Sequence, residues 1–146
     1  MKQQKITASA FIYHNKKVLL VKRADSETFA PNHWELPGGH MEFGETIEEG
    51  LLRECIEEVG FSVNIKNTFH SFTFITDNDM THYIENINLC APKSSHPAVT
   101  LNPKEHSDYK WIKSKEELDE LDMFFEEKNA AVKGFEHVLS TPLGLE

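Results

Sequence analysis

Short apolar runs along the first third of the chain are separated by polar residues. Residues 6–13 (ITASAFIY) and 18–22 (VLLVK) are rich in apolar and β-branched residues, and the polar HNKK lies between them. This pattern predicts two strands joined as a hairpin. Residues 24–46 contain two Pro and three Gly and keep no regular period, which predicts a loop. The Phe and Trp within this loop indicate that parts of it are held against the core.

From Ile47 onward the apolar residues recur with a helical period, and Gly60 predicts the end of the helix. Thr46 and Glu49 have the spacing of a capping box at its start. At about 100° per residue, the apolar side chains share one arc of the helix: Leu51, Leu52, Cys55, Ile56 and Val59. An adjoining arc is acidic and consists of Glu54, Glu57 and Glu58.

The rest of the chain predicts strands followed by a helical C-terminal segment. Three β-like runs come first: 61–76, which we expect either as one strand or as two, 81–91 and 107–113. Residues 115–139 have helix-forming composition but an imperfect apolar stripe, so we expect one helix interrupted either near 123–125 or near Gly134. Strands on both sides of a central helix predict one mixed α/β or α+β domain over residues 1–146.

Composition and charge narrow the class of protein. The chain is 39% hydrophobic and carries a formal net charge of −9, which argues against a general nucleic-acid or membrane-surface binder. Cys55 and Cys90 are isolated, as expected for a reducing compartment. We find neither a secretory signal pattern nor an apolar run long enough for a membrane span, and we therefore expect a cytoplasmic protein.

The acidic arc of the central helix repels itself at a cost of about 0.2 to 0.5 kcal/mol for each like-charge pair. Arg53 can pair with Glu57 or Glu49 but cannot neutralise the whole arc. Gly50 precedes Glu54 by one helical turn, which permits either a close approach of a ligand or tight helix-to-loop packing. An acidic helix face is often simply solvated. The alternative that we favour is a site for Mg²⁺ or Mn²⁺, because the arc offers only oxygen ligands.

Residues 39–61 (GHMEFGETIEEGLLRECIEEVGF) resemble the Nudix box. The matching positions are Gly39, Glu45, Arg53, Glu54, Glu57, Glu58 and Gly60, with Phe61 in the closing hydrophobic position. Cys55 occupies the position at which the Nudix box has an aliphatic residue, and we expect it to be a buried free thiol. The earlier WELPGG and the later EHSDYKWI extend the resemblance, which implies that the whole chain is one Nudix domain with an α/β/α sandwich and a mixed β-sheet.

The resemblance implies roles for the matching residues. Nudix enzymes use Mg²⁺ or Mn²⁺ to hydrolyse the pyrophosphate linkage of a nucleoside diphosphate joined to a further group. The implied metal ligands are Glu54, Glu57, Glu58 and the carbonyl of Gly39. Arg53 would orient a glutamate, and Glu45 would brace the loop against the helix. The general base would be Glu57 or Glu54 within the box, or Glu105 outside it with His106 behind.

Substrate contacts are predicted around the box. Arg23 and Arg53 are the only arginines beside 13 lysines, and a guanidinium suits phosphate, so Arg23 is a candidate substrate contact. Glu35 and His40 flank the Gly-Gly turn as further candidates, with loop stabilisation as the alternative. Tyr83 and Phe29 are candidates for stacking on a base, with core packing as the alternative. Trp34 and Trp111 we expect to be core anchors.

The form WELPGGHMEFGET resembles the Nudix subgroup that converts nucleoside triphosphates, modified ones included, to monophosphates and pyrophosphate. Hydrolysis of ADP-ribose or a nucleotide sugar is the alternative within the enzyme class. A nucleotide-sensing module without catalysis is an alternative of another class, although it would not need three self-repelling glutamates. An isomerase of prenyl diphosphates would require a further catalytic Cys, and Cys90 is the only spare one. The resemblance also implies that a homodimer is an option, because many Nudix enzymes pair.

Overall fold

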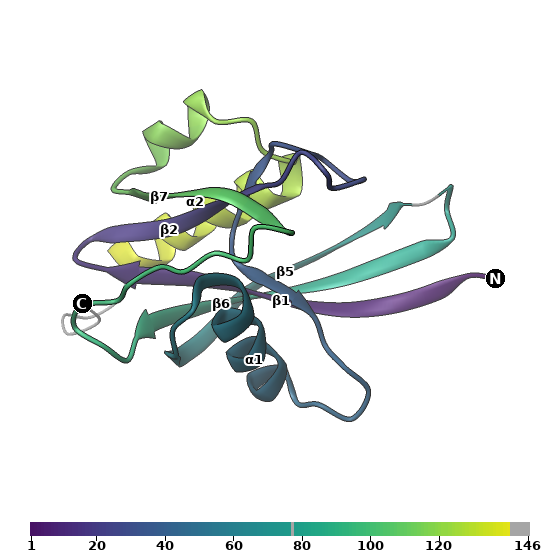
Figure 1. Cartoon of the computed structure of the whole chain (residues 1–146), viewed down its shortest axis with the longest axis horizontal. Helices are drawn as coiled ribbons and strands as arrows, with labels where there is room; N and C mark the ends of the chain where they lie inside the picture. The colour runs from purple at the N-terminus through teal and green to yellow at the C-terminus, as the bar shows by residue number, and fades with distance from the viewer. Residues whose placement is uncertain (77, 141–146) are drawn as a thin grey trace.

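The computed structural model describes residues 1–76 and 78–140 (Figure 1). Its elements are β1 (Gln3–His14), β2 (Lys17–Arg23), β3 (Trp34–Glu35), β4 (Gly38–His40), α1 (Ile47–Val59), β5 (Val63–Thr76), β6 (Thr81–Pro92), β7 (His106–Ile112), the 3₁₀ helix η1 (Lys115–Glu120) and α2 (Phe125–Leu139). The first hairpin and the central helix agree with the sequence prediction. The segment predicted as a loop contains the short strands β3 and β4, because pairing with β2 and β1 organises it.

The strands form a mixed sheet in the order β3-β2-β1-β6-β5, with β7 also paired to β2 and β4 to β1. β1 runs parallel to β6 over most of its length, whereas all the other pairs are antiparallel. β5 is a single strand whose register against β6 shifts twice, between Ile65 and Asn67 and between Thr68 and His70. The alternative of two separate strands over 61–76 is therefore wrong, and the two bulges explain why the pattern looked divided.

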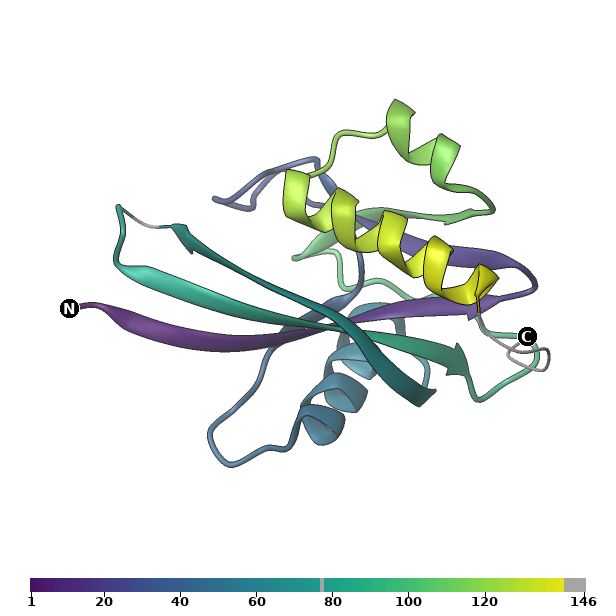
Figure 2. The same cartoon turned by 180° about the vertical axis from the view of Figure 1, so that it is seen from behind.

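The two helices cover opposite faces of the sheet (Figures 1 and 2). One core contains Phe11, Leu20, Ile87, Leu118, Ala131 and Phe135 on the α2 side. The other contains Ala8, Ile12, Leu19, Leu51, Cys55, Val59 and Cys90 on the α1 side. Alternate residues of β1 thus point into different cores, as the period of a strand requires. The result is the predicted α/β/α sandwich, with both cysteines free and buried.

The C-terminal segment is interrupted at the first of the two predicted places. η1 ends at Glu120 and α2 begins at Phe125, whereas Gly134 lies inside α2. A Cβ at Gly134 would lie 2.2 Å from the Phe11 ring, so the glycine lets α2 pack closely on β1. The imperfect stripe therefore reflects close packing at Gly134 and not a second break.

We expect Gly134→Ala to lower the free energy of unfolding by about 1 to 3 kcal/mol, although alanine favours a helix, because the added methyl group overpacks the core against Phe11. Chemical denaturation measures the change. Lys133→Ala, at the exposed neighbouring position, is the control and should leave stability within about 0.5 kcal/mol. Equal stability of the Gly134 variant and the wild type would contradict the packing argument.

Helix α1 has the ends that the sequence predicts. The Thr46 side chain accepts the Glu49 N–H (3.1 Å), and the Glu49 carboxylate accepts the Thr46 N–H (2.9 Å), which completes the capping box. Gly60 ends the helix in the left-handed region (φ 81°). A Cβ at Gly50 would lie 2.2 Å from the Met41 sulfur, so the glycine serves helix-to-loop packing. No helix in the described ranges is long and apolar enough to cross a membrane.

Candidate active site

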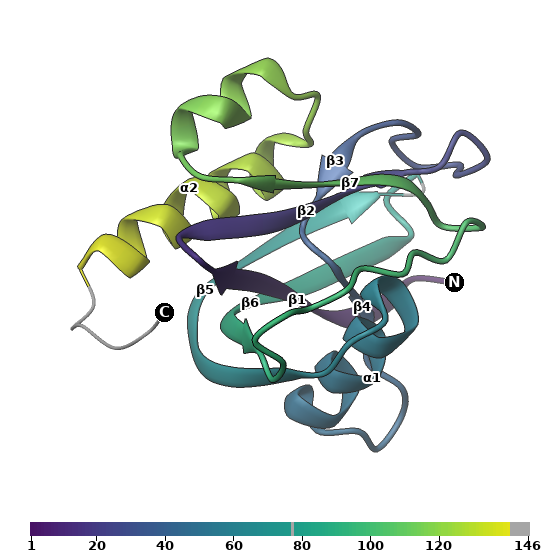
Figure 3. The same ribbon diagram turned by 60° about the vertical axis from the view of Figure 1, so that its left-hand side comes forward.

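A cleft of about 470 Å³ lies beside α1, which contributes Glu54 and Glu58 to its lining. Its lining comes from β1, the segment 23–40, α1, the β5–β6 hairpin, the start of β7 and the start of α2. Figure 3 shows β4 beside α1, with the segment that leads into β7 running across them. Side chains from distant parts of the sequence therefore meet in one concave site.

Two of the three box glutamates that we predicted as ligands face this cleft. Glu58 is only 6% exposed, and its Oε1 accepts the N–H of Gly38 (2.8 Å). Burial, and then the negative charge of Glu35, raise its pKa well above the usual value. Glu54 lies against Gly39, where a Cβ would come within 2.5 Å of its carboxylate. Only a glycine at position 39 therefore allows the Glu54 carboxylate to lie this close to the backbone.

Glu105 and His106 join Glu58 from the other side. One ligand atom from each of the three residues lies within 4.8 Å of the others. Within the described residues, the Glu105 carboxylate makes no hydrogen bond, and the buried Nδ1 of His106 has no partner. The two carboxylates of this group offer oxygen ligands to a divalent cation.

The backbone around Glu105 is fixed relative to α1. Thr100 N–H donates to the carbonyl of Val59 (2.9 Å) at the end of the helix. The amides of Glu105 and His106 both donate to the carbonyl of Asn102, at 3.0 and 2.9 Å. A compact turn therefore carries Glu105 from the end of α1 to the cleft.

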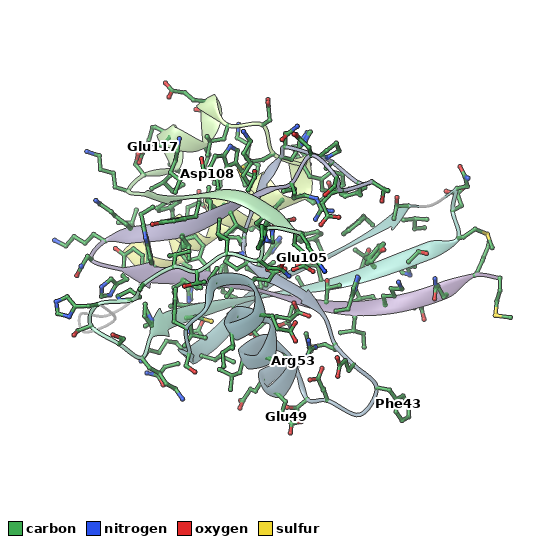
Figure 4. The ribbon with its side chains drawn as sticks, viewed as in Figure 1. Phe43, Glu49, Arg53, Glu105, Asp108 and Glu117 are labelled. Carbon is green, nitrogen blue, oxygen red and sulfur yellow. The ribbon has the colours of Figure 1, made fainter. Side chains whose placement is uncertain are left out.

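Arg53 connects the box loop with the acidic arc (Figure 4). Its Nε and Nη2 donate to the two oxygens of Glu45 (2.8 and 2.9 Å), and Nη1 donates to Glu54 (2.9 Å). Nη2 also donates to the His40 carbonyl (2.9 Å). Glu57 accepts from Nη1 at 3.3 Å, its side chain is 52% exposed, and it does not line the cleft. Of the two partners that we expected for Arg53, Glu57 forms the pair, whereas Glu49 caps the helix.

Glu45 is the strongest partner of Arg53, and its hydrogen bonds with the guanidinium lower its pKa to about 2. We expect Glu45→Gln to lower the melting temperature at neutral pH. A depressed pKa stabilises the fold above the unfolded value near 4.5, and this stabilisation is lost as pH falls toward 2. The difference in melting temperature between variant and wild type should therefore shrink from pH 5 to pH 2. Glu48→Gln, an exposed carboxylate in the same region, should show no comparable pH-dependent difference.

The predicted substrate contacts Arg23 and Glu35 both line the cleft, but they are already bound to each other. Arg23 Nη1 donates to Glu35 (3.3 Å), and a hydrogen bond joins Glu35 to His106 Nε2 (2.9 Å). The three residues lie on the adjacent strands β3, β2 and β7, which explains their proximity. Arg23 Nε also donates to the Phe29 carbonyl (2.8 Å) and its guanidinium lies over the Phe29 ring. Arg23 therefore organises the cleft wall in this state.

Aromatic rings line the other part of the cleft. We call Phe29, Phe74, Phe124, Tyr83 and His40 the aromatic wall. Tyr83 stacks on Phe74 with 5.0 Å between ring centroids, and His40 stacks on Tyr83 at 5.7 Å. Burial, with a smaller effect of Lys5, lowers the pKa of His40. The structure thus gathers the sequence candidates Tyr83, Phe29 and His40 on one surface, whereas Trp34 is buried in the core.

Sequence analysis missed three carboxylates of the cleft: Glu27, which pairs with Arg23 (3.5 Å), Glu85 and Glu127. Glu85 is buried on β6 and accepts hydrogen bonds from the hydroxyls of Thr7 and Ser9. Glu127 is in the first turn of α2 and accepts the N–H of Leu36 (2.9 Å). The only sequence signal for Glu85 is that a charged residue stands in a strand of mostly apolar and uncharged polar residues. Glu127 carries no such signal, because acidic residues are common in the first turn of a helix.

Comparisons with known proteins agree with this geometry. The family model described as NUDIX domain matches residues 3–132. Nucleoside triphosphatase NudI of Salmonella agona is 32% identical over 124 residues, which cover 78% of this chain and 85% of that protein. A MutT protein from Methanosarcina mazei Go1 has the same fold, with a TM-score of 0.78 at 23% identity and coverage of 96% of this chain and 98% of that one.

A shorter and more similar match covers the region of the box. The m7GpppN-mRNA hydrolase NUDT17 of Xenopus laevis is 54% identical over 46 residues, which cover 32% of this chain. The match spans only 16% of that protein's length. It therefore describes a shared local motif.

Proposed function

Because this chain belongs to the Nudix family and is a Nudix pyrophosphohydrolase, we propose that it hydrolyses a nucleoside triphosphate to a nucleoside monophosphate and pyrophosphate. The observation that carries the proposal is one cleft with clustered carboxylates in one part and an aromatic wall in the other. The first part suits phosphates with a divalent cation, and the second suits a base. The similarity to a protein named as a nucleoside triphosphatase supports the triphosphate as substrate.

We assign Mg²⁺ or Mn²⁺ as the cofactor, held by Glu54, Glu58 and the carbonyl of Gly39. When bound, such a cation supplies screening of phosphate charge and a lower pKa for water. Arg53 holds the Glu54 carboxylate in place. Glu57 remains a proposed ligand, although its half-exposed carboxylate would have to leave Arg53 to serve as one. Burial, followed by the negative charge of Glu35, raises the pKa of Glu58, and a bound cation would favour its ionised form.

We assign Glu105 as the general base. Its carboxylate lies in the cluster and makes no hydrogen bond within the described residues, so it is available to take a proton from water. The water oxygen then forms a bond to phosphorus, and the bridging P–O bond breaks to release pyrophosphate. Glu54 is the alternative base within the box, but its carboxylate already accepts a hydrogen bond from Arg53 and we assign it to the metal.

A panel of nucleoside triphosphates and deoxynucleoside triphosphates with Mg²⁺ tests the proposal. We expect release of pyrophosphate in stoichiometric amounts with the monophosphate, and loss of activity with excess chelator. Cleavage of ADP-ribose or a nucleotide sugar with no pyrophosphate from any triphosphate would overturn the substrate and leave the reaction class intact. Tight nucleotide binding without turnover would instead favour the sensing module.

Three broader proposals remain. We infer that residues 1–146 form one Nudix domain, which the family match over 3–132 supports. We infer a cytoplasmic protein that acts on a small nucleotide, and a homodimer stays an option for its assembly. The prenyl-diphosphate isomerase finds no support in the described residues, because Cys90 is buried in the core on the α1 side.

A further inference from the structure

The start of α2 contributes two side chains to the part of the cleft that carries the aromatic wall. Phe124 is the N-cap residue of α2, and Glu127 follows three positions later on the same side of the helix. The Phe124 ring packs against Phe29 (5.4 Å between centroids) and Phe74 (5.3 Å). Both Phe124 and Glu127 line the cleft. A carboxyl group thus lies one helical turn from the aromatic wall.

This carboxyl group keeps hydrogen-bonding capacity toward the cleft. Glu127 Oε1 accepts the N–H of Leu36 (2.9 Å). Its Oε2 accepts no hydrogen bond from residues 1–76 or 78–140. A polar atom that faces a cleft without a protein partner is available to a ligand.

The surroundings of Glu127 favour its neutral form. Burial, followed by the negative charges of Glu85 and Glu35, raises its pKa well above the usual value. The hydrogen bond from Leu36 N–H and then the positive charge of Arg23 oppose this shift without reversing it. A neutral carboxyl group offers an O–H donor beside a carbonyl acceptor. Because Leu36 already donates to Oε1, the proton belongs on Oε2.

One short segment sets the separation between Glu127 and the carboxylate cluster. Leu36 N–H bonds Glu127 of α2, and Gly38 N–H bonds Glu58 of α1 (2.8 Å). Leu36 and Gly38 are two residues apart, so at most roughly 7 Å of chain separates them. A nucleoside with its first phosphate can bridge such a separation once the two hydrogen bonds are added. The spacing therefore suits a base at Glu127 and phosphates at Glu58.

We propose that Glu127 is a specificity-determining residue, which hydrogen-bonds the edge of a base stacked on the aromatic wall and selects bases that present a donor beside an acceptor. The inference rests on the proposed nucleotide substrate. The natural bases carry such an edge, whereas an apolar base of the same shape would leave the Glu127 carboxyl group unpaired.

Calorimetric binding tests this without turnover. The ligands are the nucleoside 5′-monophosphates, ribose 5-phosphate, and a monophosphate whose base is an apolar isostere. The wild type should bind its best natural monophosphate roughly ten- to a hundredfold more tightly than the isostere. Glu127→Leu should remove this advantage and leave the affinity for ribose 5-phosphate unchanged. Glu127→Gln should keep most of it, since an amide also offers a donor and an acceptor and can bond Leu36.

Glu126→Gln is the matched control, because it removes a neighbouring charge from the same helix turn and its residue does not line the cleft. The control should bind every ligand as the wild type does. Equal wild-type affinity for the natural monophosphates and the isostere would overturn the proposal, and this comparison needs no variant to fold. If the glutamine and leucine variants lost this advantage in affinity equally, the argument that Glu127 binds the base as a neutral carboxyl group would be wrong. If the proposed function fails, pyrophosphate release is absent while these affinities still report on Glu127.

Discussion

Replacing Glu58 by glutamine is expected to lower kcat by at least about 100-fold while the protein stays folded. The loss follows because a cation that screens phosphate charge contributes several kcal/mol to the transition state, and each 1.36 kcal/mol is a factor of ten. The fold survives because an amide oxygen can still accept the N–H of Gly38. Steady-state kinetics with saturating Mg²⁺ measures the loss.

The stability of the same variant provides a second readout. The raised pKa of Glu58 means that ionisation opposes folding, so without metal the wild type loses stability as pH rises above about 4.5. The Glu58→Gln variant lacks this loss and should be the more stable protein at neutral pH. Added Mg²⁺ should raise the melting temperature of the wild type and not that of the variant. An equal response of both proteins to Mg²⁺ would remove Glu58 from the ligand set.

Replacing Glu105 by glutamine is expected to lower kcat by roughly 10² to 10⁴-fold, which is the usual range for a general base. The Glu105 side chain makes no hydrogen bond to the described residues and its negative charge helps to raise the pKa of Glu58, so the variant should be at least as stable as the wild type. It should also keep the increase of melting temperature with Mg²⁺, which separates a proton acceptor from a metal ligand. Steady-state kinetics with saturating Mg²⁺ measures the loss of kcat.

Glu116→Gln is the control for Glu105, because Glu116 is exposed on η1 and does not line the cleft. It should match the wild type in rate and in pH dependence. A Glu105 variant that keeps more than about a tenth of the wild-type kcat would place the proton acceptor elsewhere, with Glu54 as the next residue to test.

The sequence predicted the parts of the site that depend on local spacing. Glu54 and Glu58 share a helix face because a helix has a fixed period, and the capping box and Gly60 set where that helix begins and ends. Glu57 shows the limit of this reasoning, since the arc that it shares with Glu54 extends past the edge of the cleft. The helical period of the sequence predicts which side chains share a face of α1, but it does not predict how many of them the cleft reaches.

The parts that the sequence could not predict depend on long-range pairing. β3 and β4 have only two and three residues, and they exist as strands because β2 and β1 pair with them. The approach of Glu127 to Leu36 joins residues 91 positions apart. The aromatic wall likewise draws Phe29, Phe74 and Phe124 from three separate segments. No local sequence pattern predicts these long-range contacts.

The hydrogen bond between Thr100 and Val59 has a consequence for how this chain can change length. The bond brings Thr100 back to the end of α1 after the chain has formed the β5–β6 hairpin. Residues inserted at the turn between β5 and β6 would leave the carboxylates of α1 and of Glu105 in place. A single residue inserted between Thr100 and Glu105 would instead shift the carboxylate out of the cluster. Tolerance to insertion should therefore be high at the turn between β5 and β6 and close to zero in the five positions after Thr100.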